Sequence, residues 1–268
     1  MADEVPEAPQ SDPGREAFWR GILMGTDPRY RSSRAWLKHV PGGTRCKLCA
    51  APFEGLFTPW MRVIGRRQWH RNPRYCHFCF SILEAQNGGA EIECSLLFAD
   101  VRGSTALAEG MAATQFRDLL DRFYRVAADI LVAQDGIIDK FVGDEVVAIF
   151  IPALAYEAHA SRALAAATAL MAATGHDDPR GPWLPIGAGI ATGVAYVGSV
   201  GSGTHLELTA IGDVVNTAAR LAGAAGAGEI LLTMPAVGRT EIDSSAVEHR
   251  HLDLKGKSSQ VEVAVVRA

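Results

Sequence analysis

Two aspartates stand where a carboxylate could bind a metal ion in this 268-residue chain. Asp100 follows the apolar run at residues 95–99, which has the composition of a buried strand, and a Gly-Ser-Thr turn comes after it. A carboxylate at the end of a buried strand is held rigidly and stays reachable, which suits a hard cation that prefers oxygen ligands. Asp144 lies in a Gly-Asp turn between two further apolar runs. Taken singly, each aspartate is also compatible with an ordinary turn or helix cap.

Four of the five cysteines form two C-x-x-C pairs, Cys46 with Cys49 and Cys76 with Cys79. Four thiolates in a tetrahedral array suit structural zinc, and we expect one Zn²⁺ in this cluster. The gap between the pairs is somewhat longer than usual, so a loop must bulge out between them. An iron–sulfur cluster with the same ligands stays open as the alternative. Cys94 lies in the predicted strand before Asp100, and we expect it to be a core residue.

The overall composition is that of a globular chain with a sizeable core, 48% hydrophobic and 21% charged. The net charge of −4 lacks the basic footprint of typical nucleic-acid-binding proteins. Residues 62–74 are locally basic, but no recognition motif accompanies them, so we do not expect a nucleic-acid partner. The first residues are acidic and unlike a secretory signal, and no apolar segment is long enough to span a bilayer. We therefore expect a cytoplasmic protein without a membrane partner.

The chain divides into three predicted parts. Residues 1–16 are rich in Pro, Glu and Asp and are expected to form a disordered tail. Residues 17–89 carry scattered large apolar residues and the paired cysteines, and form a helical four-cysteine module that ends in a Gly-Gly linker. Residues 90–268 alternate between strand and helix patterns and form the larger domain.

The larger domain is predicted to be an α+β fold, a ferredoxin-like βαββαβ sandwich with extra strands. Its first strand ends at Asp100, and apolar residues then recur at helical spacing. The remaining expected elements are a hairpin at 136–150, a helix at 157–173, a hairpin at 186–191 and 195–200, a strand at 206–211, a helix from 212, and strands at 230–233, 247–254 and 261–266.

Four motifs in order make the chain from Cys94 onward resemble the catalytic domain of class III nucleotidyl cyclases. They are Phe98-Ala-Asp-Val-Arg-Gly-Ser-Thr, Lys140-Phe-Val-Gly-Asp, Thr209-Ala-Ile-Gly-Asp-Val-Val-Asn-Thr-Ala-Ala-Arg and Leu254-Lys-Gly-Lys. The resemblance implies conversion of ATP or GTP into a 3′,5′-cyclic nucleotide. In that reaction the ribose 3′-hydroxyl attacks the α-phosphate and pyrophosphate leaves, so the protein needs no nucleophile of its own.

The resemblance gives the aspartates a role in metal binding. Asp100 and Asp144, helped by the backbone carbonyl of Val101, are expected to hold two Mg²⁺ or Mn²⁺ ions per site. Such ions lower the pKa of the attacking hydroxyl and offset the charge of the polyphosphate.

The resemblance also assigns residues to the substrate. Asn216 and Arg220 are four residues apart and share a helix face. Asn216 is expected to orient the ribose, and Arg220 to stabilise the charge that develops on the α-phosphate. Lys255 looks like the lysine for the terminal phosphates, a role that Lys257 takes if the alignment is shifted by two residues.

Base choice is expected to depend on Lys140 and Thr209. Lys140 offers only donors, which suits the acceptor N1 of adenine and opposes the N1–H of guanine. Guanylate cyclases of the family have a glutamate here, so we expect ATP as the substrate and an adenylate cyclase as the enzyme. Thr209 replaces the aspartate common in animal adenylate cyclases. A hydroxyl accepts from the adenine amino group but can also donate to guanine O6, which leaves a relaxed preference open.

The resemblance finally implies a homodimer with shared active sites. In the family, one subunit supplies the metal aspartates and the other supplies the base, ribose and phosphate residues. This chain carries both sets, so two copies related by two-fold symmetry suffice. Two alternatives remain: a catalytically silent nucleotide-binding or regulatory module, and a cyclase of relaxed preference gated by a redox-sensing cysteine module.

Overall fold

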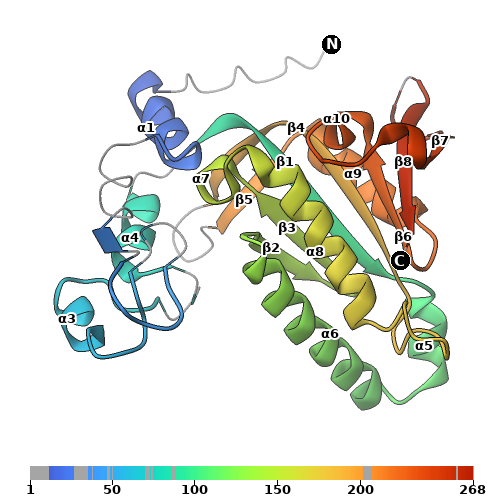
Figure 1. Ribbon diagram of the computed structural model, residues 1–268, viewed down its shortest axis with the longest axis horizontal. Coiled ribbons are helices and arrows are strands. Elements are labelled where there is room, and N and C mark those ends of the chain that lie inside the picture. Colours follow the sequence, from blue (N-terminus) through green and yellow to red (C-terminus); the bar gives the residue numbers. More distant parts are fainter. Residues whose placement is uncertain are drawn as a thin grey trace, which may run out of the picture.

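The computed structural model describes a mixed sheet with helices on both faces, joined to a smaller N-terminal part (Figure 1). The described residues are 12–26, 36–37, 39–46, 49, 51–69, 73, 75–85, 88–201, 207–257 and 259–267. The helices are α1 (Pro13–Leu23), α3 (Thr58–Val63), α4 (His77–Ala85), α5 (Ser104–Gly110), α6 (Ala113–Ala133), α7 (Pro152–Ala155), α8 (His159–Ala173), α9 (Asp213–Ala224) and α10 (Met234–Val237), with 3-10 turns at Tyr156–Ala158 and Ser244–Ala246. The strands are β1 (Gly89–Val101), β2 (Ile137–Val142), β3 (Glu145–Phe150), β4 (Ile186–Val200), β5 (Glu207–Ile211), β6 (Glu229–Thr233), β7 (Glu248–Leu252) and β8 (Val261–Arg267).

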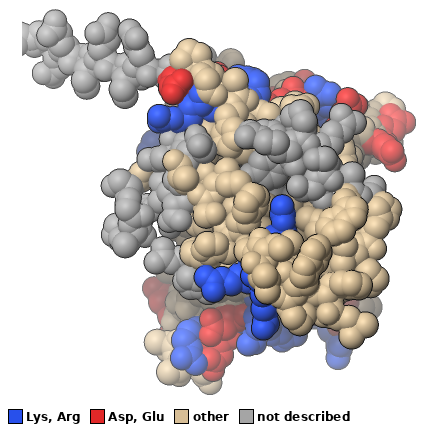
Figure 2. Space-filling view, turned by 90° about the vertical axis from the view of Figure 1, so that its left-hand side faces the viewer, with Lys and Arg blue, Asp and Glu red and all other residues tan. Residues whose placement is uncertain are grey.

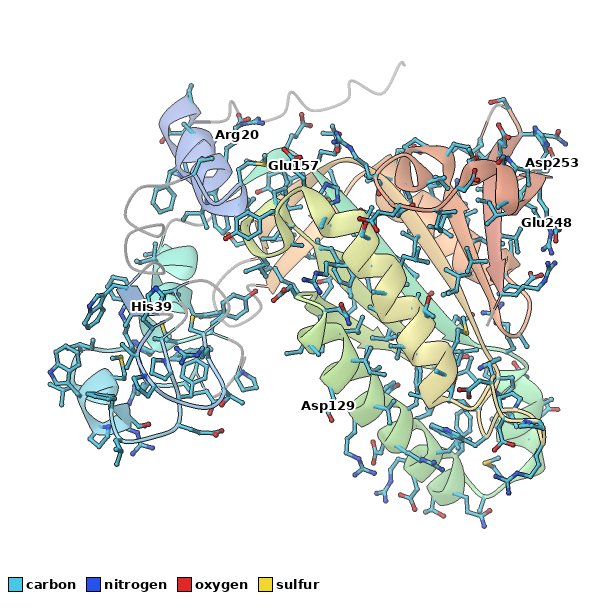
Figure 3. All side chains as sticks on the ribbon, in the orientation of Figure 1. Arg20, His39, Asp129, Glu157, Glu248 and Asp253 are labelled. Atoms are coloured by element: carbon cyan, nitrogen blue, oxygen red, sulfur yellow. The ribbon has the colours of Figure 1, made fainter. Side chains whose placement is uncertain are left out.

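The strand order of the sheet is β2-β3-β1-β4-β6-β8-β7, and β5 pairs with β4 outside this path. The β4–β6 pair is parallel and the other pairs are antiparallel. The expected βαββαβ order with appended strands is therefore confirmed. His39 of the N-terminal part and Glu248 of β7 lie at opposite ends of the molecule (Figure 3).

The central strand β1 is buried on both faces. Ile92, Cys94 and Leu96 contribute to a buried cluster that includes α9, whereas Leu97 and Ala99 contribute to the cluster beneath α6 and α8. Successive side chains of a strand point to opposite faces, so a strand covered on both sides reads as a continuous apolar run. Cys94 is completely buried, as expected for a core residue.

One sequence prediction about the sheet was wrong. We expected a hairpin at 186–200 with a turn at Thr192-Gly-Val, but β4 runs through this segment as one strand. Its register with β1 is unbroken there, with Ser95 opposite Thr192 and Cys94 opposite Gly193. The turn-like composition is overridden because the thirteen residues of β1 offer hydrogen-bonding partners along the whole segment.

A second prediction was wrong at the N-terminus. Residues 13–16, which we expected to belong to the disordered tail, form the first turn of α1, while residues 1–11 lie outside the described residues. Asp12 caps this helix by accepting hydrogen bonds from the backbone N–H of Gly14 and Arg15, at 3.0 and 3.4 Å. Pro13 occupies the first helical position, where its missing N–H costs nothing.

The N-terminal part shares its buried core with the sheet. Trp19, Ile22 and Leu23 of α1 belong to the same buried cluster as Ile92 and Leu96 of β1.

The side of the molecule that carries α3 and α4 has a mostly uncharged described surface, with Lys and Arg grouped below its centre (Figure 2). No helix in the described ranges has both the length and the apolar character needed to cross a membrane.

Candidate active site and metal centre

The two candidate metal aspartates lie side by side. Asp100 is opposite Glu145 in the β1–β3 register, and Asp144 is in the two-residue turn that joins β2 to β3. The backbone N–H of Val101 donates to the carbonyl of Asp144 at 3.3 Å. Gly143 takes the first turn position with φ +61°, a conformation that favours glycine. The hairpin thus brings Asp144 to the end of β1, as the sequence predicts.

A tyrosine of α6 holds this turn in place. The hydroxyl of Tyr124 donates a hydrogen bond to the carbonyl of Gly143. The ring of Tyr124 also packs against Phe141 of β2, with the ring centroids 4.5 Å apart. The long amphipathic helix α6 therefore positions the turn that carries Asp144.

Negative charge is concentrated around these aspartates. Burial raises the pKa of Asp100, the nearby charge of Asp144 raises it further, and the guanidinium of Arg102 opposes both effects. Burial, together with the charges of Asp100 and Asp144, raises the pKa of Glu145 to about 7. Carboxylates crowded in this way favour a bound cation, because a nearby positive charge stabilises their ionised form.

Arg102 is the cation that meets this charge in the structure. It forms an ion pair with Asp100, and its guanidinium also donates to the carbonyls of Gly223 and Ala225 at 3.1 and 3.3 Å. These carbonyls belong to the C-terminal end of α9 and the residue after it. Arg102 therefore links the Asp100 carboxylate to α9.

The donor set fits divalent magnesium or manganese. Two carboxylates and a backbone carbonyl are hard oxygen ligands, and they lie at the rigid end of a buried strand. Asp100, Asp144 and the carbonyl of Val101 are the residues that would hold such ions.

The next candidate residues lie on α9, which approaches the sheet closely. A Cβ at Gly189 of β4 would lie 2.3 Å from the backbone nitrogen of Ala222 and 2.4 Å from the carbonyl oxygen of Ala218. Any side chain at position 189 would push α9 outward, so this glycine sets the height of the helix above the sheet. Asn216 is exposed on α9 and Arg220 is half-buried. Neither side chain has a hydrogen-bond or ion-pair partner within the part of the chain that the structure describes.

The Leu254–Lys257 turn lies beside Arg220. A Cβ at Gly256, whose φ is +80°, would lie 3.2 Å from a terminal nitrogen of the Arg220 guanidinium. Lys257 forms an ion pair with Asp213 in the first turn of α9. Lys255 is exposed and has no ion-pair partner among the described residues. The two lysines of this motif therefore differ, because only Lys255 is free to meet another charged group.

The two candidate base-recognition residues meet at a third residue, Asp139. The hydroxyl of Thr209 donates to Oδ2 of Asp139 at 2.8 Å, and Nζ of Lys140 lies 3.6 Å from the same oxygen. Thr209 is buried, and the Asp139 side chain is only 4% exposed, against 43% for Lys140. The structure therefore brings together Lys140 of β2 and Thr209 of β5, which are far apart in sequence.

The candidate residues fall into two groups within one chain. One group is Asp100, Val101 and Asp144, and the other group lies on α9, the base-recognition strands and the 254–257 turn. Among the described residues, no hydrogen bond or ion pair joins either aspartate to Asn216 or Arg220. The only described polar link between the metal residues and α9 is the Arg102 side chain, which contacts the backbone at the helix end.

The four paired cysteines form a second candidate metal centre. The sulfurs of Cys46, Cys49, Cys76 and Cys79 all lie within 4.8 Å of one another, and all four residues are buried. None forms a disulfide. The Cys49 and Cys76 sulfurs are 3.7 Å apart, which matches the spacing of about 3.8 Å between ligands of tetrahedral zinc with Zn–S bonds of about 2.3 Å.

The surroundings of this cluster also favour thiolates bound to a cation. Backbone N–H groups point at the sulfurs, with Cys76 donating to Cys46 at 3.2 Å and Cys79 donating to Cys76 at 3.4 Å. Burial by itself raises the pKa of Cys46 well above its usual value and so opposes its thiolate form. A zinc ion would offset this effect, because cysteines coordinate zinc as thiolates. Burial likewise raises the pKa of Cys94 to about 12, which fits an inert core thiol.

Sequence reasoning missed two residues of the active-site region. Arg102 lies within the first motif, but its partner at the end of α9 is more than a hundred residues away in the sequence. The local sequence around Arg102 therefore does not indicate this contact. Asp139 immediately precedes Lys140, and a regular strand would send the two side chains to opposite faces. A break in the β2 register at this point changes that arrangement, and nothing in the local sequence indicates the break.

A comparison with protein families identifies the larger domain. The profile of the adenylate and guanylate cyclase catalytic domain matches residues 89–266, which is more than half of the chain. The chain belongs to this family. The match starts at the first residue of β1 and ends one residue before the end of β8, so it covers all the candidate active-site residues.

Solved cyclase structures have the same fold. The guanylyl cyclase Cya2 covers 67% of this chain and 93% of its own, at 25% identity and a TM-score of 0.61. The adenylyl cyclase CyaB from P. aeruginosa covers 67% of this chain and 96% of its own, at 30% identity and a TM-score of 0.59. Cyclases of both substrate classes therefore resemble this chain.

Sequence relatives cover a smaller share of their own length. Two uncharacterized proteins of Mycobacterium tuberculosis (strain ATCC 25618 / H37Rv), Rv1319c and Rv1318c, are 34% identical over 136 residues and 31% identical over 181 residues. These matches cover 51% and 66% of this chain but only 25% and 33% of the relatives. The chain thus spans a third or less of the length of these relatives.

Proposed function

We propose that this cyclase-family chain is an adenylate cyclase that converts ATP into 3′,5′-cyclic AMP and pyrophosphate. The observation that carries the proposal is the Asp100–Asp144 carboxylate pair at the end of β1, on a fold of the cyclase family. A silent member of the family would be expected to lack one of the metal aspartates or the arginine, and this chain retains all of them.

Divalent metal ions, when bound by the two carboxylates, supply Lewis acidity toward the 3′-hydroxyl and the phosphates. The side chains of the protein do the rest by positioning and by charge. Arg220 has no ionic partner among the described residues, so its guanidinium is available for charge that develops on the α-phosphate. Asn216, exposed one turn earlier on α9, can orient the ribose. Lys255 is available for the terminal phosphates, whereas Lys257 is engaged with Asp213.

The proposed choice of ATP rests on Lys140. Its ammonium has only donors, so it pairs with the acceptor N1 of adenine and opposes the N1–H of guanine. Thr209 lies close to Lys140 through their common contact with Asp139 and would meet the amino group of adenine. The likeness to the guanylyl cyclase Cya2 keeps a GTP-using cyclase as the second candidate function.

The proposed active unit is a homodimer in which each site takes residues from both copies. Two features support it. Among the described residues of one chain, no hydrogen bond or ion pair joins the metal aspartates to Asn216 or Arg220. Large apolar side chains next to the site residues are also exposed, with Val194 60% and Ile211 52% accessible. Exposed apolar surface of this kind is typical of an interaction face.

For the N-terminal cluster we propose one structural Zn²⁺ bound by Cys46, Cys49, Cys76 and Cys79. The close approach of four buried sulfurs supports a tetrahedral ion. An iron–sulfur cluster would use the same ligands and would make this part a redox sensor that gates the cyclase.

Five unpaired cysteines and an ATP substrate together favour the cytoplasm as the site of action.

The direct test of activity uses the full chain with ATP or GTP and either Mn²⁺ or Mg²⁺. Chromatography should detect cyclic AMP and an equal amount of pyrophosphate, formed faster than cyclic GMP at equal nucleotide concentration. Asp100→Asn should lower the rate by at least about a hundredfold, because it removes ligand charge without touching the core.

Asp129→Asn is the matched control, since Asp129 is an exposed aspartate of α6 outside the site (Figure 3). It should keep the wild-type rate within about twofold. A rate near wild type in Asp100→Asn would refute the metal assignment. Absence of any cyclic product from a folded, metal-loaded dimer would support a silent module instead.

A further inference from the structure

A β-bulge shapes the part of β2 that carries Lys140. Ile138 pairs with Ala148 and Lys140 pairs with Val147, so Asp139 is an extra residue in the ladder. Adjacent residues of a regular strand point to opposite faces. The bulge instead leaves the Asp139 carboxylate 3.6 Å from the Lys140 ammonium. Bulges next to active sites commonly redirect side chains in this way.

The Asp139 carboxylate also fixes the hydroxyl of Thr209. Oγ1 of Thr209 lies 2.8 Å from Oδ2 of Asp139, and both side chains are largely buried. An ionised carboxylate only accepts hydrogen bonds, so the threonine hydroxyl must be the donor in this contact. A hydroxyl has one proton, and here that proton is used. Only the lone pairs of Thr209 Oγ1 remain for any other group.

We propose that Asp139 is a positioning residue that sets the base preference of this site, by holding the Thr209 hydroxyl as an acceptor. The inference rests on the proposed function, in which Lys140 and Thr209 face the nucleobase. A free threonine hydroxyl could donate to guanine O6 as readily as it accepts from the adenine amino group. The hydrogen bond to Asp139 removes the first possibility, because the hydroxyl proton is already donated.

Oδ2 of Asp139 contacts both candidate base-recognition residues and so places a hydrogen-bond donor next to an acceptor. Lys140 presents a donor, and Thr209 beside it presents an acceptor. The edge of adenine offers the complementary pair, an acceptor at N1 and a donor at the 6-amino group. Guanine offers the reverse pair, a donor at N1 and an acceptor at O6. The donor and the acceptor held by the Asp139 carboxylate therefore complement adenine at both N1 and the 6-amino group. They are mismatched with guanine at both N1 and O6.

Two simpler roles compete with this one. Asp139 could only stabilise the bulge, or it could act through Lys140 alone. A double-substitution cycle with Thr209 separates these roles, because an effect carried by the threonine hydroxyl disappears once that hydroxyl is gone.

The experiment measures the affinity of the full chain for non-cyclisable α,β-methylene analogues of ATP and GTP, and the cyclisation rates with ATP and GTP. Asp139→Ala should lower the ATP-over-GTP preference about tenfold, the scale of one neutral hydrogen bond. In a Thr209→Val background the same substitution should change the preference by less than about twofold. An unchanged preference in Asp139→Ala, or an equal further fall in the valine background, would overturn the inference.

Two further variants serve as a control and as a substitute for Asp139→Ala. Thr192→Val removes another buried threonine hydroxyl, one that contacts Ser95, and should leave the preference unchanged. If Asp139→Ala does not fold, Asp139→Leu carries the test. Leucine has a similar volume but cannot accept a hydrogen bond from Thr209, so the preference must fall there too.

The two readouts keep this inference separate from the proposed function. Failure of the wild-type chain to form cyclic product, with a changed binding preference in Asp139→Ala, refutes the activity and supports the role of Asp139. Normal cyclase activity with an unchanged preference in Asp139→Ala supports the proposed activity and refutes the role of Asp139.

Discussion

At the scale of single residues, the candidate site holds charges that need partners from outside the chain. Asp100 has a raised pKa and its nearest cation is Arg102, which is also bound to the end of α9. On the other side, Arg220 and Lys255 have no ion-pair partner among the described residues. Metal ions would satisfy the first group, and a nucleoside triphosphate would satisfy the second.

Arg220 gives the sharpest residue-scale prediction about catalysis. Arg220→Ala should lower kcat about a hundredfold to a thousandfold, because the guanidinium meets charge that grows in the transition state. The KM for ATP should change much less, since ground-state binding rests mainly on other groups. Steady-state kinetics with ATP and Mn²⁺ measure both parameters.

Arg125→Ala is the control, because Arg125 is an exposed arginine of α6 outside the site. Its kcat should stay within about twofold of wild type. If Arg220→Ala instead raised KM strongly and left kcat unchanged, Arg220 would be a substrate-binding residue and not a catalytic one.

At the scale of elements, the four-cysteine cluster is predicted to contain one metal ion that organises the N-terminal part. Elemental analysis should find about one zinc per chain, since structural zinc supplies much of the folding energy of a small module. Cys76→Ser should lose the zinc, whereas Cys94→Ser should keep it, because Cys94 is a core residue of β1. Iron with a visible absorption band would replace the zinc assignment with a redox cluster.

A charge network joins the three strands at the far edge of the sheet. Glu229 of β6 accepts two hydrogen bonds from Arg250 of β7, at 2.6 and 2.9 Å, and lies 3.2 Å from Arg267 of β8. These hydrogen bonds from Arg250 lower the pKa of Glu229 to about 2, against a usual value of 4.5. Glu248, at the outer edge strand, contacts the same two arginines (Figure 3).

This network predicts a pH dependence of stability. A depressed carboxylate pKa stabilises the fold fully above about pH 4.5, and the contribution is lost as the pH falls toward 2. Glu229→Gln should therefore cost about 1–3 kcal/mol in the free energy of unfolding at pH 7, and progressively less below pH 4.5. Urea unfolding at several pH values measures this difference.

The control for this measurement is Glu241→Gln, an exposed glutamate with no ion pair among the described residues. It should change stability by less than about 0.5 kcal/mol at any pH. A Glu229→Gln effect of the same size at pH 7 and pH 3 would show that the ionisation of Glu229 does not stabilise the fold.

The elements also show what the sequence could and could not predict. Apolar runs and helical spacing predicted β1, α6 and the β2–β3 hairpin, because those patterns are local and both faces of β1 and β3 are buried. The supposed turn at Thr192-Gly-Val was wrong, since pairing with β1 decides that segment and the partner lies about a hundred residues away. Asp139 was missed for a related reason, because a bulge depends on the register between two strands.

At the scale of the whole molecule, the metal aspartates and the substrate residues of α9 are linked only indirectly among the described residues. Arg102 joins the metal residues to the end of α9, but no described hydrogen bond or ion pair joins the aspartates to Asn216 or Arg220. Exposed apolar residues flank the site, including Val142, Val194 and Ile211. Two copies of the chain would cover this surface and could combine the two groups.

The most direct test mixes two variants that are each inactive alone. Asp100→Asn lacks a metal carboxylate, and Arg220→Ala lacks the α-phosphate arginine. If the site is shared by two copies, half of the dimers in an equal, freely exchanging mixture are mixed, and each has one intact site. Cyclic AMP formation from ATP and Mn²⁺ should then recover to about a quarter of the wild-type rate. No recovery in a mixture whose subunits demonstrably exchange would contradict a shared site and, with it, the proposed assembly of this cyclase.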